Sequence, residues 1–130
     1  MLKLTIKGDP TTKKNHSQII AKNGKPFLIP SEQYKKYEEE FLYQCMEQRA
    51  WKKNISTPVN IKCLYYMKTR RKVDLANLLN GTDDALVHAE VIEDDNCKII
   101  VGHDGSRVYY DKNNPRVEIE ITDAERSFID

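Results

Sequence analysis

Three aspartates and a short run of cations are the residues of this chain best suited to chemistry. The cations fall within residues 68–72, Asp74 follows them, and Asp94 and Asp95 come later, in the acidic segment 90–96. Carboxylate oxygens are the hard ligands that Mg²⁺ prefers, and this ion usually takes one or two of them together with substrate phosphate. Cationic side chains neutralise the phosphates of nucleic acids. The pattern indicates metal-dependent hydrolysis of a phosphodiester, with Mg²⁺ or, in its place, Mn²⁺.

The metal hypothesis depends on where the aspartates meet. We expect Asp74 at the start of a helix and Asp94 and Asp95 just before the following strand, with the helix folded back so that these two corners lie close. Asp74 and Asp95 would then hold the metal, and Asp94 would assist. Positions on opposite sides of the molecule would count against a nuclease. Asp84 lies ten residues beyond Asp74, roughly 15 Å along a helix, so it cannot share that ion and is assigned a supporting, dimer or structural role.

Two groups of cations are candidates for holding a nucleic-acid backbone. One precedes Asp74, and the other lies in a polar loop near the N-terminus. The formal net charge is only +1, so the local clustering carries the argument rather than the total. The candidate DNA-binding residues are Lys68, Arg70, Arg71, Lys72, Lys13 and Lys14.

Each of these residues also has an ordinary structural interpretation. Asp74 is a sound N-cap for a helix, and residues 94–96 have the composition of a turn. Isolated lysine pairs are often solvated. His88 and His103 lack any partner at a motif spacing, and each is read as a surface or core histidine rather than a general base.

The composition predicts one globular domain over residues 1–130. Hydrophobic residues make up 39% and charged residues 32% of the chain, which excludes a disordered protein. No apolar run is long enough to cross a bilayer, and the N-terminus does not have the pattern of a signal peptide. The cysteines, Cys45, Cys63 and Cys97, are odd in number and scattered, so we expect reduced, buried thiols in a cytoplasmic protein with no membrane partner.

Hydrophobic periodicity predicts an α+β fold, a mixed sheet with two main helices packed on it. Strands are expected at 2–7, on either side of Asn23-Gly24, at 59–66, at 97–103, at 108–110 and at 117–121. A kink or bulge is expected at 102–106. One helix should begin after Ser31 and run to about Lys52, and the second should begin at Asp74. Residues 11–17 are expected to form a mobile loop and residues 123–130 a frayed tail. The predicted helix residues facing the core are Tyr34, Tyr37, Phe41, Leu42, Cys45 and Met46, then Leu75, Leu78, Leu79, Thr82 and Leu86.

The stretch from 70 to 96 resembles the RusA-type Holliday junction resolvases. In that family a basic stretch leads into Asp-Leu-Asp-Asn, then a Lys three residues after the Asn, then Asp-Ala-Leu, and then Val/Ile-x-Asp-Asp. This chain has Asp74-Leu75, Asn77, Asp84-Ala85-Leu86 and Ile92-Glu93-Asp94-Asp95 in the same order. Further matches are the polar loop Pro10 to Asn15, the Ser31-x-x-Tyr34 helix start and Pro115-x-Val117-x-Ile119. The resemblance implies a Mg²⁺-dependent endodeoxyribonuclease, a homodimer that makes paired nicks in four-way junction or other branched DNA, as in phages and prophages.

Two positions depart from the family pattern. Ala76 stands where the family has its second Asp, and Asn80 stands where it has Lys. Asn77 remains as an amide oxygen near the site, and the arginines before Asp74 are candidates to supply the missing charge. Three hypotheses follow: a junction-resolving nuclease, a junction-binding protein with weak or no cleavage, and a generic interaction module whose acidic patch is only surface.

Overall fold

The computed structural model describes residues 1–11, 17–22, 25–30 and 32–125, the two middle ranges as backbone only. Lys13 and Lys14, the predicted turn at Asn23-Gly24, Ser31 and residues 126–130 lie outside the described part. The described elements, in chain order, are β1 (Leu2–Lys7), β2 (Ser17–Lys22), β3 (Lys25–Pro30), α1 (Glu32–Glu47), β4 (Val59–Met67), α2 (Leu75–His88), β5 (Ile100–Gly102), β6 (Arg107–Tyr110) and β7 (Arg116–Asp123).

The main sheet is mixed, which confirms the predicted α+β class. Strand β7 lies between β1 and β4 and is antiparallel to both, whereas β5 and β6 each pair parallel with β4. Strand β5 pairs with the start of β4 and β6 with its end. The predicted kink is therefore a complete break, with Gly105 at φ +88° in the turn between β5 and β6. Strands β2 and β3 pair antiparallel in a separate two-stranded sheet.

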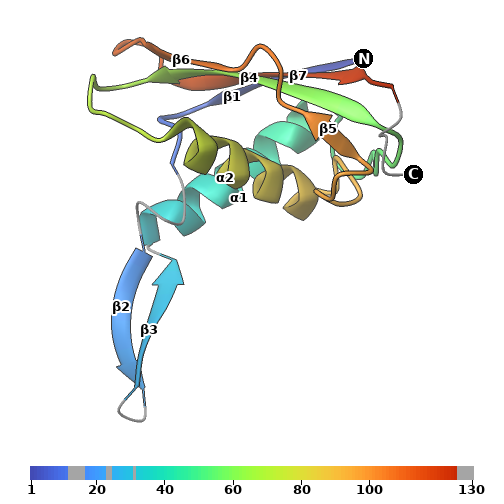
Figure 1. Cartoon of the computed structure of the whole chain (residues 1–130). Coiled ribbons are helices and arrows are strands. Elements are labelled where there is room, and N and C mark those ends of the chain that lie inside the picture. Colours follow the sequence, from blue (N-terminus) through green and yellow to red (C-terminus); the bar gives the residue numbers. More distant parts are fainter. Residues whose placement is uncertain (12–16, 23–24, 31, 126–130) are drawn as a thin grey trace.

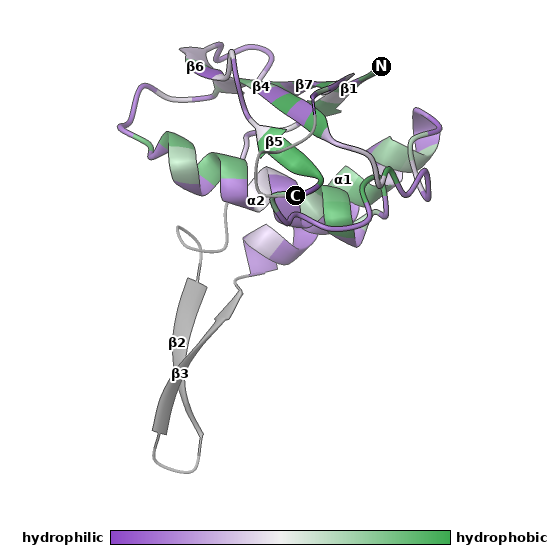
Figure 2. Ribbon diagram, turned by 45° about the vertical axis from the view of Figure 1, so that its right-hand side comes forward, coloured by the Kyte–Doolittle hydropathy of each residue, from purple (hydrophilic) through white to green (hydrophobic). Residues whose placement is uncertain are grey.

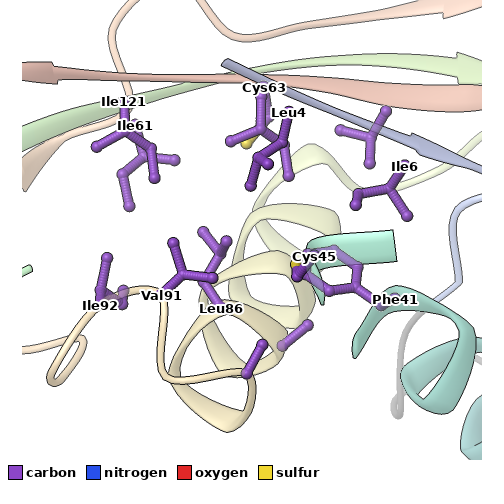
Figure 3. Close-up of a cluster of buried hydrophobic side chains, with 14 of the residues drawn as sticks. Leu4, Ile6, Phe41, Cys45, Ile61, Cys63, Leu86, Val91, Ile92 and Ile121 are labelled. Atoms are coloured by element: carbon purple, nitrogen blue, oxygen red, sulfur yellow. The ribbon is translucent and has the colours of Figure 1, made fainter. Parts of the chain in front are cut away.

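Both helices cover one face of the main sheet (Figure 1). In β4 the odd-numbered residues, such as Ile61, Cys63 and Tyr65, are buried and the even-numbered ones are half-buried, as alternation along a strand requires. Figure 3 shows side chains from the sheet facing Phe41 and Cys45 of α1 and Leu86 of α2 across this core. Each such fully buried side chain contributes roughly 1.5–3 kcal/mol, so the sheet–helix layer is the main source of stability.

Helix α1 ends five residues before the predicted Lys52. Arg49 adopts φ 61°, the Ala50 N–H donates to the Cys45 carbonyl, and the Arg49 N–H donates to the Met46 carbonyl. This pair of bonds is a Schellman motif, which usually has glycine at the left-handed position. Because arginine occupies it here, the sequence carries no stop signal. Met46, predicted to face the core, is instead 42% exposed.

Helix α2 is held at both ends and along its buried face. Asp74 is its N-cap, and Glu90, at φ 56°, closes a second Schellman motif in which the Val91 N–H donates to the Leu86 carbonyl. Leu78, Thr82 and Leu86 are buried as predicted. Leu75 and Leu79 pack at the edge of the core.

The outer edge of the sheet is closed by side chains of α1. Gln48 and Gln44 each exchange two hydrogen bonds with the backbone of β1, at Thr5 and Lys7 respectively, at 2.7–3.0 Å. Pairing of these backbone groups protects an edge strand from adding a foreign strand.

The remaining predictions concern cysteines, the tail and membranes. Cys45 and Cys63 are buried, and burial raises the pKa of each thiol to about 12, whereas Cys97 is exposed, contrary to the prediction. At the start of the predicted tail, Asp123 ends β7 and the Ala124 N–H donates to the Pro58 carbonyl. Within the described ranges, no helix has the length and apolarity that a bilayer crossing needs.

Candidate metal centre and nucleic-acid interface

Asp74 caps helix α2 and keeps part of its carboxylate available. Its backbone is extended, and its Oδ1 accepts a hydrogen bond from the Ala76 N–H at 2.9 Å. The residue is exposed, and Oδ2 has no hydrogen-bond partner among the described residues. A carboxylate has room for more than one contact. The capping role and a ligand role are therefore compatible at this position.

The basic run lies on the connection between β4 and α2. The Lys68 N–H donates to Asp9 Oδ1 at 2.9 Å, and the guanidinium carbon of Arg70 lies 4.0 Å from the ring centroid of Tyr110. Each cation of the run is exposed. The run is therefore held at the backbone of Lys68 and at the side chain of Arg70. Its charged groups face solvent immediately before Asp74. The four exposed cations are Lys68, Arg70, Arg71 and Lys72.

Asp94 and Asp95 differ in what surrounds them. Asp94 Oδ1 accepts from the Asp95 N–H at 2.9 Å, and Oδ2 accepts from Asn96 Nδ2 at 2.8 Å. The hydrogen bond from Asn96, followed by that from the Asp95 backbone, lowers the pKa of Asp94. Asp94 thus stabilises the turn. Asp95 is exposed and lines a shallow hollow beside the end of α2, together with Glu38, Asp84, Val87 and His88.

The predicted convergence of Asp74 and Asp95 is wrong for a single chain. Asp74 caps the first residue of α2, whereas Asp95 lies beside Val87 and His88 in its last turn. A helix of 14 residues is about 20 Å long, so one ion cannot contact both carboxylates. In agreement, the described residues contain no cluster of three or more His, Cys, Asp or Glu side chains able to hold a metal.

The parallel pairing of β4 and β5 explains this separation. A helix that connects two parallel strands runs back along the sheet, so its start follows the end of the first strand and its end precedes the start of the second. Asp74 follows β4, and Asp95 precedes β5, whose residues pair with the beginning of β4. Figure 1 shows the two connections at opposite ends of α2.

The remaining predicted site residues lie along α2. Asn77, Asn80 and Asp84 recur at helical spacing with His88, so they share one face of the helix. Asn77 is half-buried, and the other three are exposed. This stripe joins the Asp74 end of the helix to the Asp95 end. Ala76, in the first turn, is exposed and adds no oxygen ligand.

A buried ion pair was missed by the sequence reasoning. Asp83 is only 6% exposed, and both of its oxygens lie within 3.0 Å of Nε2 of His103, a residue in the β5–β6 turn. The hydrogen bond to Asp83 raises the pKa of His103. In the same part of α2, the hydroxyls of Thr82 and Tyr65 are 2.7 Å apart. These contacts attach α2 to the sheet. The only sequence signal was a charged residue on the apolar face of a helix.

Comparison with known protein families gives a match over most of the chain. The family model described as "Endodeoxyribonuclease RusA" matches residues 7–122, which include the basic run, Asp74, all of α2 and the turn of Asp94 and Asp95. No curated protein matches the chain significantly.

Proposed function

The chain belongs to the RusA endodeoxyribonuclease family, and from this premise we propose that it is a Mg²⁺-dependent homodimer that resolves four-way DNA junctions by paired nicks. Family membership carries the coarser statement, a nuclease with Holliday junction resolvase activity. The metal, the pairing of the nicks and the dimer are inferred from the residues below.

The donor chemistry of the aspartates fits Mg²⁺. Asp74 and Asp95 are exposed carboxylates, and the cap leaves Oδ2 of Asp74 without a partner among the described residues. When bound, Mg²⁺ supplies Lewis-acid activation of phosphate and water in phosphodiester hydrolysis. Asp94 assists by fixing the turn that carries Asp95.

The observation that favours a dimer is the separation of these carboxylates at opposite ends of α2. One chain supplies only half of the expected ligand pair at each end. A second copy, related by a twofold axis with its α2 antiparallel to the first, would bring its Asp95 end next to the Asp74 end of the first copy. The same operation creates a second, equivalent site, as an isologous dimer requires. Two sites related by twofold symmetry suit a substrate that is cut on two strands.

The cations position the DNA backbone. The exposed run 68–72 lies directly before Asp74, so phosphates held by it are close to that carboxylate. Backbone contacts fix the register of DNA on a protein without reading its sequence. Lys13 and Lys14 remain proposed contacts, outside the described residues.

Cleavage of a synthetic four-way junction tests this function. Wild-type protein with Mg²⁺ is expected to nick symmetrically related strands, and Asp74→Asn and Asp95→Asn are each expected to abolish nicking while retaining junction binding. Asn is as good an N-cap as Asp, so Asp74→Asn keeps the helix start intact. Glu93→Gln, an exposed neighbour in the same connection, is the matched control and should cut normally. Full activity of both aspartate variants would move the metal elsewhere.

Ala76 and Asn80 support a second candidate, a junction-binding protein with little or no cleavage. Ala76 removes a carboxylate from the first turn of α2, and Asn80 removes a cation from its exposed face. The same assay separates the two functions. Tight, junction-specific binding by wild-type protein without nicks, in Mg²⁺ and in Mn²⁺, would favour this second candidate.

A further inference from the structure

Strand β6 exposes each of its side chains, and two of them are tyrosines on opposite faces of the sheet. Tyr110 is 39% and Tyr109 47% exposed. Tyr110 pairs with Met67 and Tyr109 pairs with Tyr66. Paired residues of neighbouring strands share a face. Because Met67 belongs to the buried core, Tyr110 lies on the face that carries the helices and Tyr109 on the outer face.

The helix-side tyrosine contacts the basic run. The Arg70 guanidinium carbon lies 4.0 Å from the ring centroid of Tyr110, and the Asp111 N–H donates to the Met67 carbonyl at 2.9 Å. The connection from β4 to α2 and strand β6 are thus held together. Figures 1 and 2 both show them at the same end of the sheet, and the connection is largely hydrophilic in Figure 2.

The outer tyrosine is in a different electrostatic environment. Tyr109 stacks on Tyr66 with ring centroids 5.2 Å apart. The guanidinium carbon of Arg116 lies 3.8 Å from the ring centroid of Tyr66. Arg116 also forms ion pairs with Asp111 at 3.1 Å and Glu118 at 2.8 Å. One cation with two carboxylates is unfavourable for a nucleic acid.

The charge around Tyr110 is the opposite. Arg70 forms no ion pair with any described residue, and it belongs to a run of exposed cations. Arg70 also precedes Asp74 by four residues, so the Cα atoms of the two residues are no more than about 14 Å apart. Nucleobases stack on aromatic rings and on arginine guanidinium planes. Such stacking tolerates any base, because every base has a π-face.

We propose that the Arg70–Tyr110 pair receives an unstacked nucleobase at the branch point of a DNA junction, an inference that rests on the proposed function. In a duplex the bases are paired and stacked, so they are not accessible to this pair. At a branch point, bases leave the stack more readily, and one placed on Arg70 and Tyr110 would keep the neighbouring phosphates beside the cations and Asp74. The pair therefore distinguishes a junction from a duplex, which the cations alone do not.

Binding by Tyr110→Leu, Tyr110→Phe and Tyr109→Leu tests the proposal. Each protein is titrated, in EDTA so that no strand is cut, against a four-way junction with 2-aminopurine beside the branch point and against a duplex of equal length. Tyr110→Leu is expected to weaken junction binding about fivefold or more, the equivalent of ~1 kcal/mol at tenfold per 1.4 kcal/mol. It should also remove the change in 2-aminopurine fluorescence.

Duplex affinity and the salt dependence of binding should stay unchanged, since no phosphate contact is lost. Tyr110→Phe, which keeps a ring, and Tyr109→Leu, on the outer face, should behave as wild type.

Several results would overturn the proposal. Equal losses for Tyr110→Leu and Tyr109→Leu would assign the effect to strand β6 as a whole. A parallel loss of duplex binding would indicate an ordinary backbone contact. A change in sedimentation of free Tyr110→Leu would mean that a second copy of the chain covers the ring. If the wild-type protein cuts junctions and Tyr110→Leu binds them normally, the stacking surface is rejected and the proposed function stands. If the wild-type protein binds no DNA, both the stacking surface and the proposed function are rejected.

Discussion

At the scale of single residues, the first turn of α2 combines a structural and a chemical requirement. Oδ1 of Asp74 caps the helix, and this fixes the carboxylate at the end of the basic run. Asp94 shows the opposite balance, because both of its oxygens are engaged within its own turn. The sequence alone assigned both aspartates to the same site, Asp74 as a metal ligand and Asp94 in an assisting role. Only the hydrogen bonds separate the aspartate that stabilises a turn from the one able to accept a ligand.

Ala76→Asp restores the family residue in that first turn. We expect the Mg²⁺ concentration for half-maximal junction cleavage to fall about tenfold, the factor that ~1.4 kcal/mol of added attraction gives. The fold should tolerate the change, because an anion in the first turn interacts favourably with the helix dipole. Ala76→Asn is the control of equal size without the charge. Identical Mg²⁺ dependence of these two variants would exclude position 76 from the metal site.

The pair of His103 and Asp83 gives the stability of the fold a specific pH dependence. The hydrogen bond to Asp83 raises the pKa of His103 above the ordinary value of 6.5. A raised histidine pKa means that the folded chain binds the proton more tightly than the unfolded chain. The stabilisation is therefore complete below about pH 6.5 and is lost as the pH rises through the pKa of the folded state.

Urea unfolding at several pH values checks this expectation. The difference in free energy of unfolding between wild type and His103→Gln should be largest near pH 6 and should shrink toward pH 8.5. In an Asp83→Asn background the same comparison should lose its pH dependence, because the negative partner is gone. A difference that grows with pH would contradict the assignment.

At the scale of elements, side-chain alternation and helical periodicity predicted most of the fold. The bounds of β1 are those expected, and β4 is one residue longer, because each has one buried face and therefore a clear period of two. The end of α1 was not predictable in this way. A left-handed residue normally announces itself as glycine, and Arg49 does not. The position of Asp95 was missed for a different reason, since it follows from the pairing of β4 with β5, a contact between segments distant in sequence.

Glycine at the two left-handed helix ends should stabilise the protein. Arg49 and Glu90 have φ values of 61° and 56°, and this conformation costs an L-residue roughly 1–2 kcal/mol. Arg49→Gly and Glu90→Gly each remove this cost and are expected to raise the free energy of unfolding by about 1 kcal/mol. The greater entropy of glycine in the unfolded chain reduces this gain. Chemical denaturation measures both. Lys36→Gly, at an exposed interior position of α1, should instead lower stability by about 1 kcal/mol. Destabilisation by all three would argue against the Schellman assignment.

At the scale of the whole molecule, the crossover that builds the sheet also separates the two proposed metal ligands. Asp74 lies where α2 begins and Asp95 where it ends, about 20 Å apart along the helix. The sequence motif gives the order of these residues along the chain but not which copy of the chain supplies each of them to a proposed site. The chain belongs to a nuclease family, and it cannot bring the two proposed metal ligands together by itself. Under the proposed function, dimer assembly is therefore a condition of catalysis.

Mixing two inactive variants tests this central claim most directly. Asp74→Asn and Asp95→Asn homodimers should each fail to cut a four-way junction. After the two are unfolded together and refolded, the mixed dimer holds one site with Asp74 from one chain and Asp95 from the other, and a second site with neither. We predict that nicking returns, on one strand of each junction, in proportion to the mixed dimer. If each site were built within one chain, both sites of the mixed dimer would lack a carboxylate, and a mixture as inactive as its components would contradict the account.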